Sequence, residues 1–260
     1  MFDDVATIAV AGDWHGNTPW ARRAVQHCAD REVSTIVHLG DFGFWPGRSG
    51  QRYLDDLEES LAAHDQRLAF VDGNHEDHLS LKAWPLSDGV HVIRPHIVHL
   101  PRGYRWTWHG RVWMSLGGAH SIDRKWRTPY VDWWPEEIIG AGDVLRATAD
   151  GPVDVMLCHD APEGVPTLTK LFADNPVGVD EVEQALSAAN RELVSQVVEG
   201  TRPLHLWHGH YHLRLEDEIV AADGHVTQVH GLDCDGTTID RNMVFVDLTD
   251  QESPCRVAKV

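Results

Sequence analysis

The stretch IAVAGDWHGN, residues 8–17, joins an apolar run to an aspartate and a histidine. Residues 5–12 (VATIAVAG) are short, apolar and β-branched and end in glycine, which predicts a buried strand. Asp13 and His15 follow that strand with one residue between them. One such pair is weak evidence of a site, so the deciding question is whether other strands end in the same way.

Four further apolar segments end in polar residues of the same kind. The segments are residues 34–40, 67–73, 152–160 and 203–212. The side chains that they present at their ends are Asp41, Asn74, His75, His159, His210 and His212. Ligand sites in open α/β sheets form beyond the carboxyl ends of the strands. We therefore expect all these side chains to gather at one sheet edge.

The residue types in this set predict two metal ions. Leaving His75 aside, the set holds two aspartates, one asparagine and four histidines. One divalent ion does not need seven ligands, whereas two ions that share a carboxylate do, and such a pair can activate a water between them. Imidazole and carboxylate donors without thiolate fit Mn, Fe, Zn or Ni better than Mg or Ca. Of these metals we expect manganese.

The remaining pattern predicts strand–helix units followed by hairpins. A helix is expected from residue 18 to 32, with Thr18 as its N-cap and Pro19 at its first position. Further helices are expected at 50–66 and 180–200, and hairpin strands at 90–115 and beyond 224. This order predicts an α/β fold in which a two-sheet β-sandwich is flanked by helices, as a single domain over residues 1–260.

Composition narrows the class of protein. The 260 residues are 42% hydrophobic, and no apolar run is long enough to span a bilayer. The first ten residues have no basic region and no cleavage site, so we expect no signal peptide. The four cysteines lie far apart without a CxxC pair. We therefore expect reduced thiols in a cytoplasmic protein.

The net charge of -18 argues against a long nucleic acid as partner, because polymer binding requires a basic stripe. An acidic chain can still bind a small anion where a metal supplies positive charge. A small phosphoester is therefore compatible with this composition. The sequence carries no signal for an oligomeric state.

The ordered motifs DWH (13–15), GD (40–41), GNHE (73–76), His159 and GHYH (209–212) resemble those of the calcineurin-like metallophosphoesterase superfamily. The resemblance covers about 200 residues and implies the αββα fold of that superfamily. It implies that Asp13, His15 and His212 hold one metal, that Asn74, His159 and His210 hold the other, and that Asp41 bridges them. A hydroxide bridging the two ions would attack phosphorus, and His75 would protonate the leaving group or stabilise the phosphoryl oxygens.

The second motif departs from the protein Ser/Thr phosphatase branch, in which it reads GDYVDRG. Here it reads GDFGFWPG, so Phe44 and Trp45 replace the second Asp and the Arg of that motif. Asp72 stands where that branch has an Arg before GNHE. The chain therefore resembles a bacterial or phage-type member outside that branch, and His75 lacks its usual orienting carboxylate.

Aromatic residues surround the first two motifs. Trp14, Phe44 and Trp45 offer a platform on which a base or another flat leaving group could stack, which favours a nucleotide-like substrate. The alternative is that they are core or lid residues. The motifs do not choose between a monoester and a diester.

The segment LGGAHSIDRKWRTP (116–129) is basic in an acidic chain. It resembles a GGA-x-S-x-D stretch of some bacterial and phage-type members of the superfamily. It carries His120, Arg124, Lys125 and Arg127. One interpretation is that it reaches over the metals and contacts substrate phosphate, with His120 and Arg124 as the candidate contacts. The other is a solvated basic loop after a hairpin.

Two rival functions remain. A nuclease of the same superfamily would need a basic channel, which this chain lacks unless a dimer builds one. A catalytically silent scaffold should have lost metal ligands, yet all seven ligand positions and His75 are present.

Overall fold

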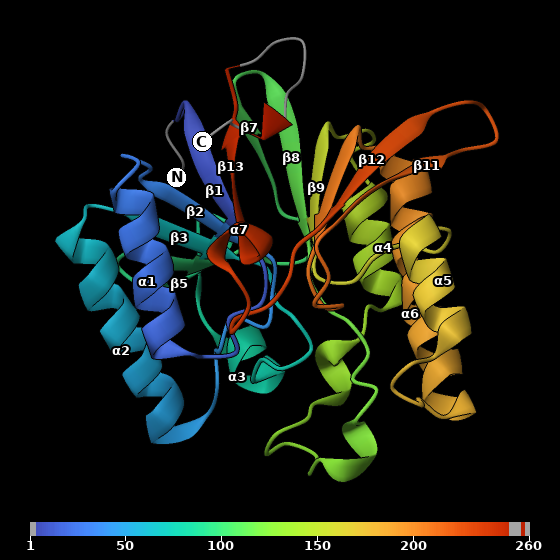
Figure 1. Cartoon of the computed structure of the whole chain (residues 1–260), viewed down its shortest axis with the longest axis horizontal. Helices are drawn as coiled ribbons and strands as arrows, with labels where there is room; N and C mark the ends of the chain where they lie inside the picture. Colours follow the sequence, from blue (N-terminus) through green and yellow to red (C-terminus); the bar gives the residue numbers. More distant parts are fainter. Residues whose placement is uncertain (1–3, 250–255, 258–260) are drawn as a thin grey trace.

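The computed structural model describes residues 4–249 and 256–257, and it contains two β-sheets packed face to face (Figure 1). The eight-stranded sheet has the order β14-β13-β1-β2-β3-β6-β5-β4. Its strands are β1 Thr7–Ala11, β2 Thr35–His38, β3 Arg67–Phe70, β4 Leu86–Ser87, β5 Val90–Arg94, β6 Ile97–His99, β13 Met243–Asp247 and β14 Arg256–Val257. The six-stranded sheet has the order β11-β12-β10-β9-β8-β7. Its strands are β7 Arg105–Trp108, β8 Arg111–Leu116, β9 Val155–Cys158, β10 His205–His208, β11 Leu215–Val220 and β12 Val226–Gly231.

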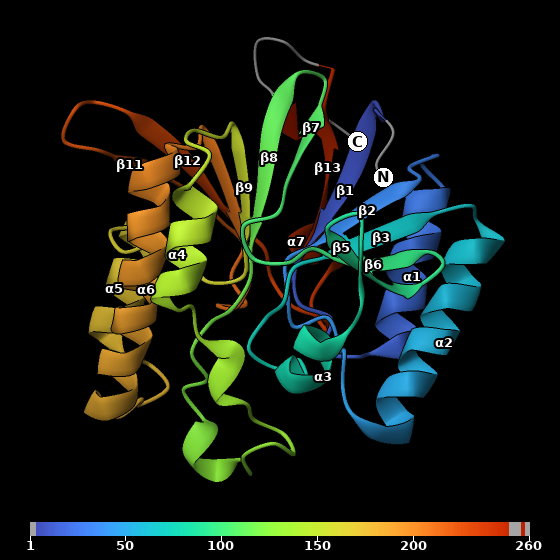
Figure 2. The same cartoon turned by 180° about the vertical axis from the view of Figure 1, so that it is seen from behind.

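Helices cover the outer face of each sheet (Figures 1 and 2). The helices α1 Thr18–Ala29 and α2 Gly47–Ala63 lie on the eight-stranded sheet, and α4 Ala141–Thr148, α5 Pro166–Asp174 and α6 Glu181–Thr201 lie on the six-stranded sheet. The short elements are α3 His78–Ala83, α7 Ile239–Asn242 and the 3₁₀ turns Arg124–Trp126 and Pro135–Glu137. This arrangement confirms the predicted α/β sandwich flanked by helices.

The apolar core between the sheets explains why the central strands read as continuous hydrophobic runs. All four residues of β2 are buried, and so are all four of β9, because each strand is covered on both faces. Ile8 and Val37 of one sheet belong to the same buried cluster as Trp113, Leu157 and Trp207 of the other. The cluster joins the two sheets and so places the carboxyl ends of their parallel strands side by side.

Two sequence expectations need correction. The N-cap of α1 is Asn17, whose side chain accepts a hydrogen bond from the backbone N–H of Trp20, so Thr18 is the first helical residue and not the cap. The expected ligands do not follow the strands of one sheet. The strands β1, β2 and β3 belong to the eight-stranded sheet, whereas β9 and β10 belong to the six-stranded sheet.

The predicted hairpins between residues 90 and 115 are present, but they divide between the sheets. The strands β5 and β6 pair in the eight-stranded sheet, and β7 and β8 pair in the six-stranded one. Among the described residues no helix is both long and apolar enough to cross a membrane. Cys28, Cys158 and Cys234 are free thiols, and Cys255 lies outside the described residues.

Candidate metal centre

The expected ligands all lie in connections that follow the carboxyl ends of strands. Asp13 and His15 lie in the connection from β1 to α1, and Asp41 follows β2. Asn74 follows β3, His159 follows β9, and His210 and His212 follow β10. Because the two sheets pack face to face, five connections that are far apart in the sequence meet in one place.

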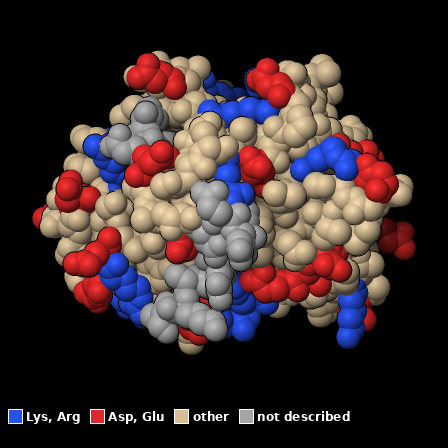
Figure 3. All heavy atoms as spheres, turned by 90° about the horizontal axis from the view of Figure 1, so that it is seen from above, with Lys and Arg blue, Asp and Glu red and all other residues tan. Residues whose placement is uncertain are grey.

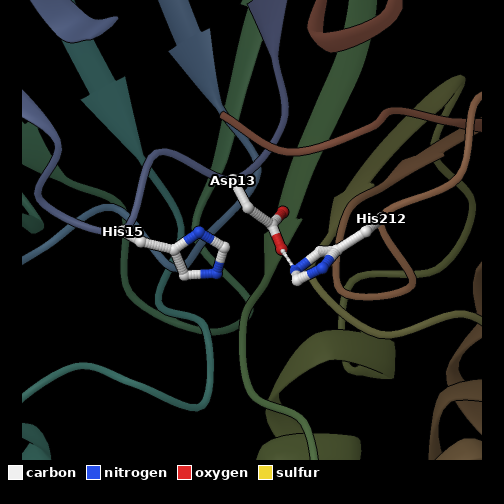
Figure 4. A group of neighbouring side chains, drawn as sticks. All are labelled: Asp13, His15 and His212. Carbon is white, nitrogen blue, oxygen red and sulfur yellow. Dashed lines mark ion pairs between the residues drawn. The ribbon is translucent and has the colours of Figure 1, made fainter. Parts of the chain in front are cut away.

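The first group of possible metal donors is Asp13, His15 and His212, whose ligand atoms all lie within 4.8 Å of one another. Figure 4 shows the Asp13 carboxylate between the two imidazoles. His212 Nε2 lies 3.2 Å from Asp13 Oδ2, and the rings of His15 and His212 have centroids 5.0 Å apart. Asp13 is fully buried, while the His212 side chain is 46% exposed, so this group opens to solvent on one side.

The second group is buried more deeply. Donor atoms of Asp13, Asp41 and His159 also lie within 4.8 Å of one another. His159 Nε2 lies 3.4 Å from Asp41 Oδ1 and 3.0 Å from Asn74 Oδ1. The ring of His210 packs against that of His159, with 5.0 Å between centroids.

Asp41 lies between the two groups. Its Oδ1 faces His159, and its Oδ2 lies 3.6 Å from His15 Nε2. A carboxylate in this position can donate one oxygen to each of two ions. The structure thus brings together all seven side chains that the sequence nominated.

The glycines of the motifs leave room for the donors, which supports a fit to metal ions. A Cβ on Gly73 would lie 2.2 Å from Asp41 Oδ1, and a Cβ on Gly209 would lie 2.2 Å from Asp13 Oδ1. A larger residue at either position would displace a carboxylate. Carboxylate and imidazole donors packed this closely suit a divalent transition metal.

The site also concentrates unusual backbone conformations. Eleven described residues other than glycine have a positive φ. Four of them are expected ligands: His15 (46°), Asp41 (50°), His210 (66°) and His212 (49°). Such conformations are uncommon outside glycine and cluster at functional sites.

Electrostatics favour the protonated form of some of the expected histidine ligands beside ionised carboxylates, whereas burial holds the pKa of His210 well below its usual value. Burial opposes the charge on His159, but Asp41 outweighs it and raises the pKa of His159 to about 10. A hydrogen bond to Asp13 raises the pKa of His212 to about 11. Burial disfavours the ionised form of Asp41, yet the neighbouring His75 and His159 hold its pKa well below the usual range. Binding of a divalent cation here would therefore release protons.

Two of the expected histidine ligands have their rings fixed by groups that were not predicted from the sequence. His15 Nδ1 lies 2.8 Å from Asp235 Oδ1, and Asn17 Nδ2 donates to Asp235 Oδ2 over 2.6 Å. His159 Nδ1 lies 2.7 Å from the carbonyl of Leu39. Both contacts leave Nε2 to face the cluster, which is the arrangement typical of metal-binding histidines.

Asn74 is oriented by the segment that follows β8. Its Nδ2 donates to Ser121 Oγ over 2.9 Å, and Ser121 donates from its hydroxyl (2.6 Å) and its backbone N–H (2.8 Å) to Glu137. Burial raises the pKa of Glu137 to about 7. These bonds turn Asn74 Oδ1 toward His159, so the buried Ser121 and Glu137 support an expected ligand.

His75 lies at the edge of the cluster, with its side chain 20% exposed. Its Nε2 is 3.8 Å from Asp41 Oδ2 and 3.4 Å from Nη2 of Arg127. Burial lowers the pKa of His75 against the opposing charge of Asp41, and Arg127 lowers it further. The acidic partner closest to its Nε2 is thus an expected metal ligand, not a residue of the 42–47 stretch.

The structure separates the three aromatic candidates for substrate contact. Trp14 is fully buried and donates from Nε1 to Asn242, and Phe44 is 3% exposed and packs edge-on against Trp84. These two residues therefore lie in the core, away from any bound substrate. Trp45 is half-buried, and its ring covers Gly16 next to His15.

The basic segment is fastened to α6. His120 Nε2 lies 2.7 Å from Glu183 Oε2, and Arg124 Nε donates to the same carboxylate over 2.9 Å. Lys125 pairs with Asp180, the N-cap of α6. Among the described residues the polar side-chain partners of His120 are Glu183 and Glu137, and that of Arg124 is Glu183, so neither bonds an expected ligand. Arg127 was noted among the basic residues of this segment but was not one of the two candidate contacts, yet it is the arginine of this segment that reaches His75.

Comparison with known proteins agrees with this geometry. The sequence model described as calcineurin-like phosphoesterase matches residues 6–214, which confirms the resemblance drawn from the motifs. No curated protein matches the chain. Among solved structures, a dimetal phosphatase from Danio rerio is 16% identical, with 94% of this chain and 93% of that chain covered and a TM-score of 0.58. The TT1561 protein of Thermus thermophilus is 14% identical, with 94% and 99% covered and a TM-score of 0.52. At these identities the likeness shows a shared fold.

Proposed function

Because the chain belongs to the calcineurin-like phosphoesterase family, we propose that it hydrolyses a small phosphoester with two divalent transition-metal ions held by the cluster at the strand ends. The observation that carries this proposal is the meeting of seven donor side chains from both sheets, two of which are buried carboxylates. Asp13, His15 and His212 would hold one ion, and Asn74, His159 and His210 the other, with Asp41 shared. Manganese is the metal that we propose to test first.

The metals supply the charge that the chain lacks. When bound, two such ions polarise the phosphoryl oxygens and lower the pKa of a water, so that it can attack phosphorus at neutral pH. With the carboxylates of Asp13 and Asp41 the local charge would be about +2 (4 − 2). That field would attract phosphate although the chain as a whole carries -18.

The protein's own residues orient the donors and handle the leaving group. Asp235 and the Leu39 carbonyl fix the rings of His15 and His159, and Ser121 fixes Asn74. His75, partly exposed beside Asp41, is placed to donate a hydrogen bond or a proton to the departing oxygen.

The acidic charge favours a small or nucleotide-like substrate over a polymer. Figure 3 views the end of the molecule away from the site, where basic and acidic side chains are interspersed. No observation on the described residues favours a nuclease. Of the aromatic candidates, Trp45 is the one whose half-buried position is compatible with contact to a flat leaving group.

The test is metal analysis combined with a paired assay. The purified protein, Asp41→Asn and the control Asp223→Asn would be loaded with Mn²⁺, and bound metal would be counted. Each would then be assayed with p-nitrophenyl phosphate and bis-p-nitrophenyl phosphate. Asp223 is 56% exposed and pairs with Arg202 on the surface, so its substitution removes the same charge away from the site.

We expect about two metals per chain and activity that Asp41→Asn abolishes and Asp223→Asn keeps. The preferred compound would separate a monoesterase from a diesterase. Two metals without turnover of either compound would call for a library of nucleotides as substrates. A protein that binds no metal and shows no activity would contradict the proposed hydrolase. That outcome would favour a catalytically silent scaffold of the same fold.

A further inference from the structure

We propose that Arg127, oriented by Asp123, binds the phosphoryl group of the substrate beside His75 and favours monoesters over diesters. This inference rests on the proposed function and names the substrate contact of the same site. It replaces the role that the sequence gave to Arg124, and it identifies the guanidinium that compensates for the arginines missing from residues 45 and 72.

Arg127 is held in a fixed orientation. Its Nε and Nη2 donate to the two oxygens of Asp123, each over 2.7 Å, and its Nη1 donates to the carbonyl of Asp132 over 3.2 Å. A bidentate pair of this kind fixes the plane of the guanidinium as well as its position. The side chain is nevertheless 25% exposed, so a solute can reach it.

Counting the N–H groups of Arg127 shows which of them can donate to a substrate. A guanidinium has five N–H donors. Asp123 takes two and Asp132 takes one, which leaves one on Nη1 and one on Nη2. The Nη2 atom lies 3.4 Å from His75 Nε2, so the remaining fork faces the group that we propose acts on the leaving oxygen. A phosphoryl oxygen beside His75 would meet the remaining Nη1 donor, and it would replace His75 Nε2 as the acceptor of the Nη2 donor.

Other cations near the site are engaged elsewhere. Arg124 is bound by Glu183, and Lys125 by Asp180. Arg102 is buried and bonds Asp72 and Asp143 together with backbone carbonyls of residues 136–138. The Arg102–Asp72 pair also shows that position 72 has a structural role in this chain.

The different charges of phosphomonoesters and phosphodiesters predict which substrate Arg127 favours. Arg127 and Asp123 together add no net charge, so the gain comes from directed donors. A phosphomonoester carries about −1.5 to −2 at pH 7, whereas a diester carries a single negative charge. Losing a charge-assisted donor should therefore weaken the monoester more than the diester.

The experiment uses the Mn²⁺-loaded full chain and two independent readouts. Inorganic phosphate would be titrated into the protein by calorimetry, and KM and kcat would be measured for p-nitrophenyl phosphate and bis-p-nitrophenyl phosphate. The variants are Arg127→Ala, Arg127→Lys and Asp123→Asn. Arg124→Ala tests the competing arginine, and Arg52→Ala on α2, with an 83% exposed side chain, is the control for loss of charge.

We expect Arg127→Ala to weaken phosphate binding about 10- to 100-fold, as loss of a hydrogen bond to a charged group does. Its KM for the monoester should rise more than its KM for the diester. Arg127→Lys should recover part of the binding, Asp123→Asn should lose part of it, and Arg52→Ala should match the wild type.

Equal phosphate affinity in the wild type and Arg127→Ala would overturn the inference while leaving the proposed hydrolase intact. An effect of Arg124→Ala larger than that of Arg127→Ala would also overturn it. If the wild type binds two metals but cleaves neither ester, the proposed hydrolase fails with these compounds. The phosphate titration still decides the role of Arg127 in that case.

Discussion

At the scale of single residues, the candidate site places ligands on backbone that most side chains avoid. A non-glycine residue with a left-handed backbone costs of order 1–3 kcal/mol and persists where the surroundings determine it. The backbone N–H of His15 donates to the Asp41 carbonyl over 2.8 Å, and that of His210 donates to the Asp13 carboxylate over 3.2 Å. The ligand loops are therefore tied to one another before any metal binds.

Asp235 should contribute to metal affinity, because it orients the ring of His15. This carboxylate lies 2.8 Å from His15 Nδ1 and is itself held by Asn17. Asp235→Asn should lower the affinity for Mn²⁺ by about 10- to 100-fold, since a partner that orients a metal-binding histidine has effects of that size. Equilibrium dialysis against Mn²⁺ would measure the change.

The control for this variant is Asp223→Asn, which removes a surface carboxylate from the turn between β11 and β12. Its metal affinity should equal that of the wild type. An unchanged affinity in Asp235→Asn would show that His15 keeps its orientation without this partner.

At the scale of elements, the connections that follow β3 and β10 pass close to the carboxylates of Asp41 and Asp13. Gly209, between β10 and His210, has room for no Cβ, because Asp13 Oδ1 would lie 2.2 Å away. Gly209→Ala should displace Asp13, and the protein should bind fewer metals per chain. Gly142→Ala on α4 is the matched control, because nothing lies within 4 Å of its Cβ position.

Metal content and thermal unfolding would be measured for both glycine variants. Gly142→Ala should keep the metals and gain slightly in stability, since replacing glycine by alanine where the backbone allows it lowers the entropy of the unfolded chain and so stabilises the fold by about 0.4–1 kcal/mol. Full metal content in Gly209→Ala would mean that the connection can shift away from Asp13 at little cost.

The elements with a strong apolar pattern were predictable from the sequence, and those with a weak pattern were not. The helix expected at 50–66 is present as α2, and its buried face includes Tyr53, Leu54, Leu57 and Leu61. The helices α4 and α5 were missed, because each buries a single residue, Ala147 or Leu168, and so shows little periodicity.

The residues of the candidate site also fall into those that the sequence could predict and those that it could not. The residues at strand ends were predictable, because parallel strands deliver their ends to a common place. Asp235 was not, because it reaches the site from an irregular segment far along the chain, and only packing brings it there. Arg127 belongs to the basic segment that was expected to reach the site, but the candidate contacts chosen within that segment were His120 and Arg124. Trp14 shows the reverse error: it lies between two expected ligands, yet its side chain turns into the core and bonds Asn242.

At the scale of the whole molecule, the candidate metal centre joins the two sheets. Asp13, Asp41 and Asn74 come from connections of the eight-stranded sheet, and His159 and His210 from those of the six-stranded sheet. The apolar cluster between the sheets sets their separation. A pair of ions held from both sides would add a second link at the strand ends.

Metal binding should therefore stabilise the whole fold, because an ion that binds the native state and not the unfolded chain adds RT ln(1 + [L]/Kd), about 2.7 kcal/mol at 100 times Kd. At about 2–4 °C per kcal/mol for a chain of this size, Tm should rise by about 5–10 °C with saturating Mn²⁺. Differential scanning calorimetry with and without Mn²⁺ would measure the shift. Asp41→Asn should lose it, and Asp223→Asn, whose carboxylate lies on the surface, should keep it. A Tm that does not respond to Mn²⁺ in the wild type would show that no ion links the sheets.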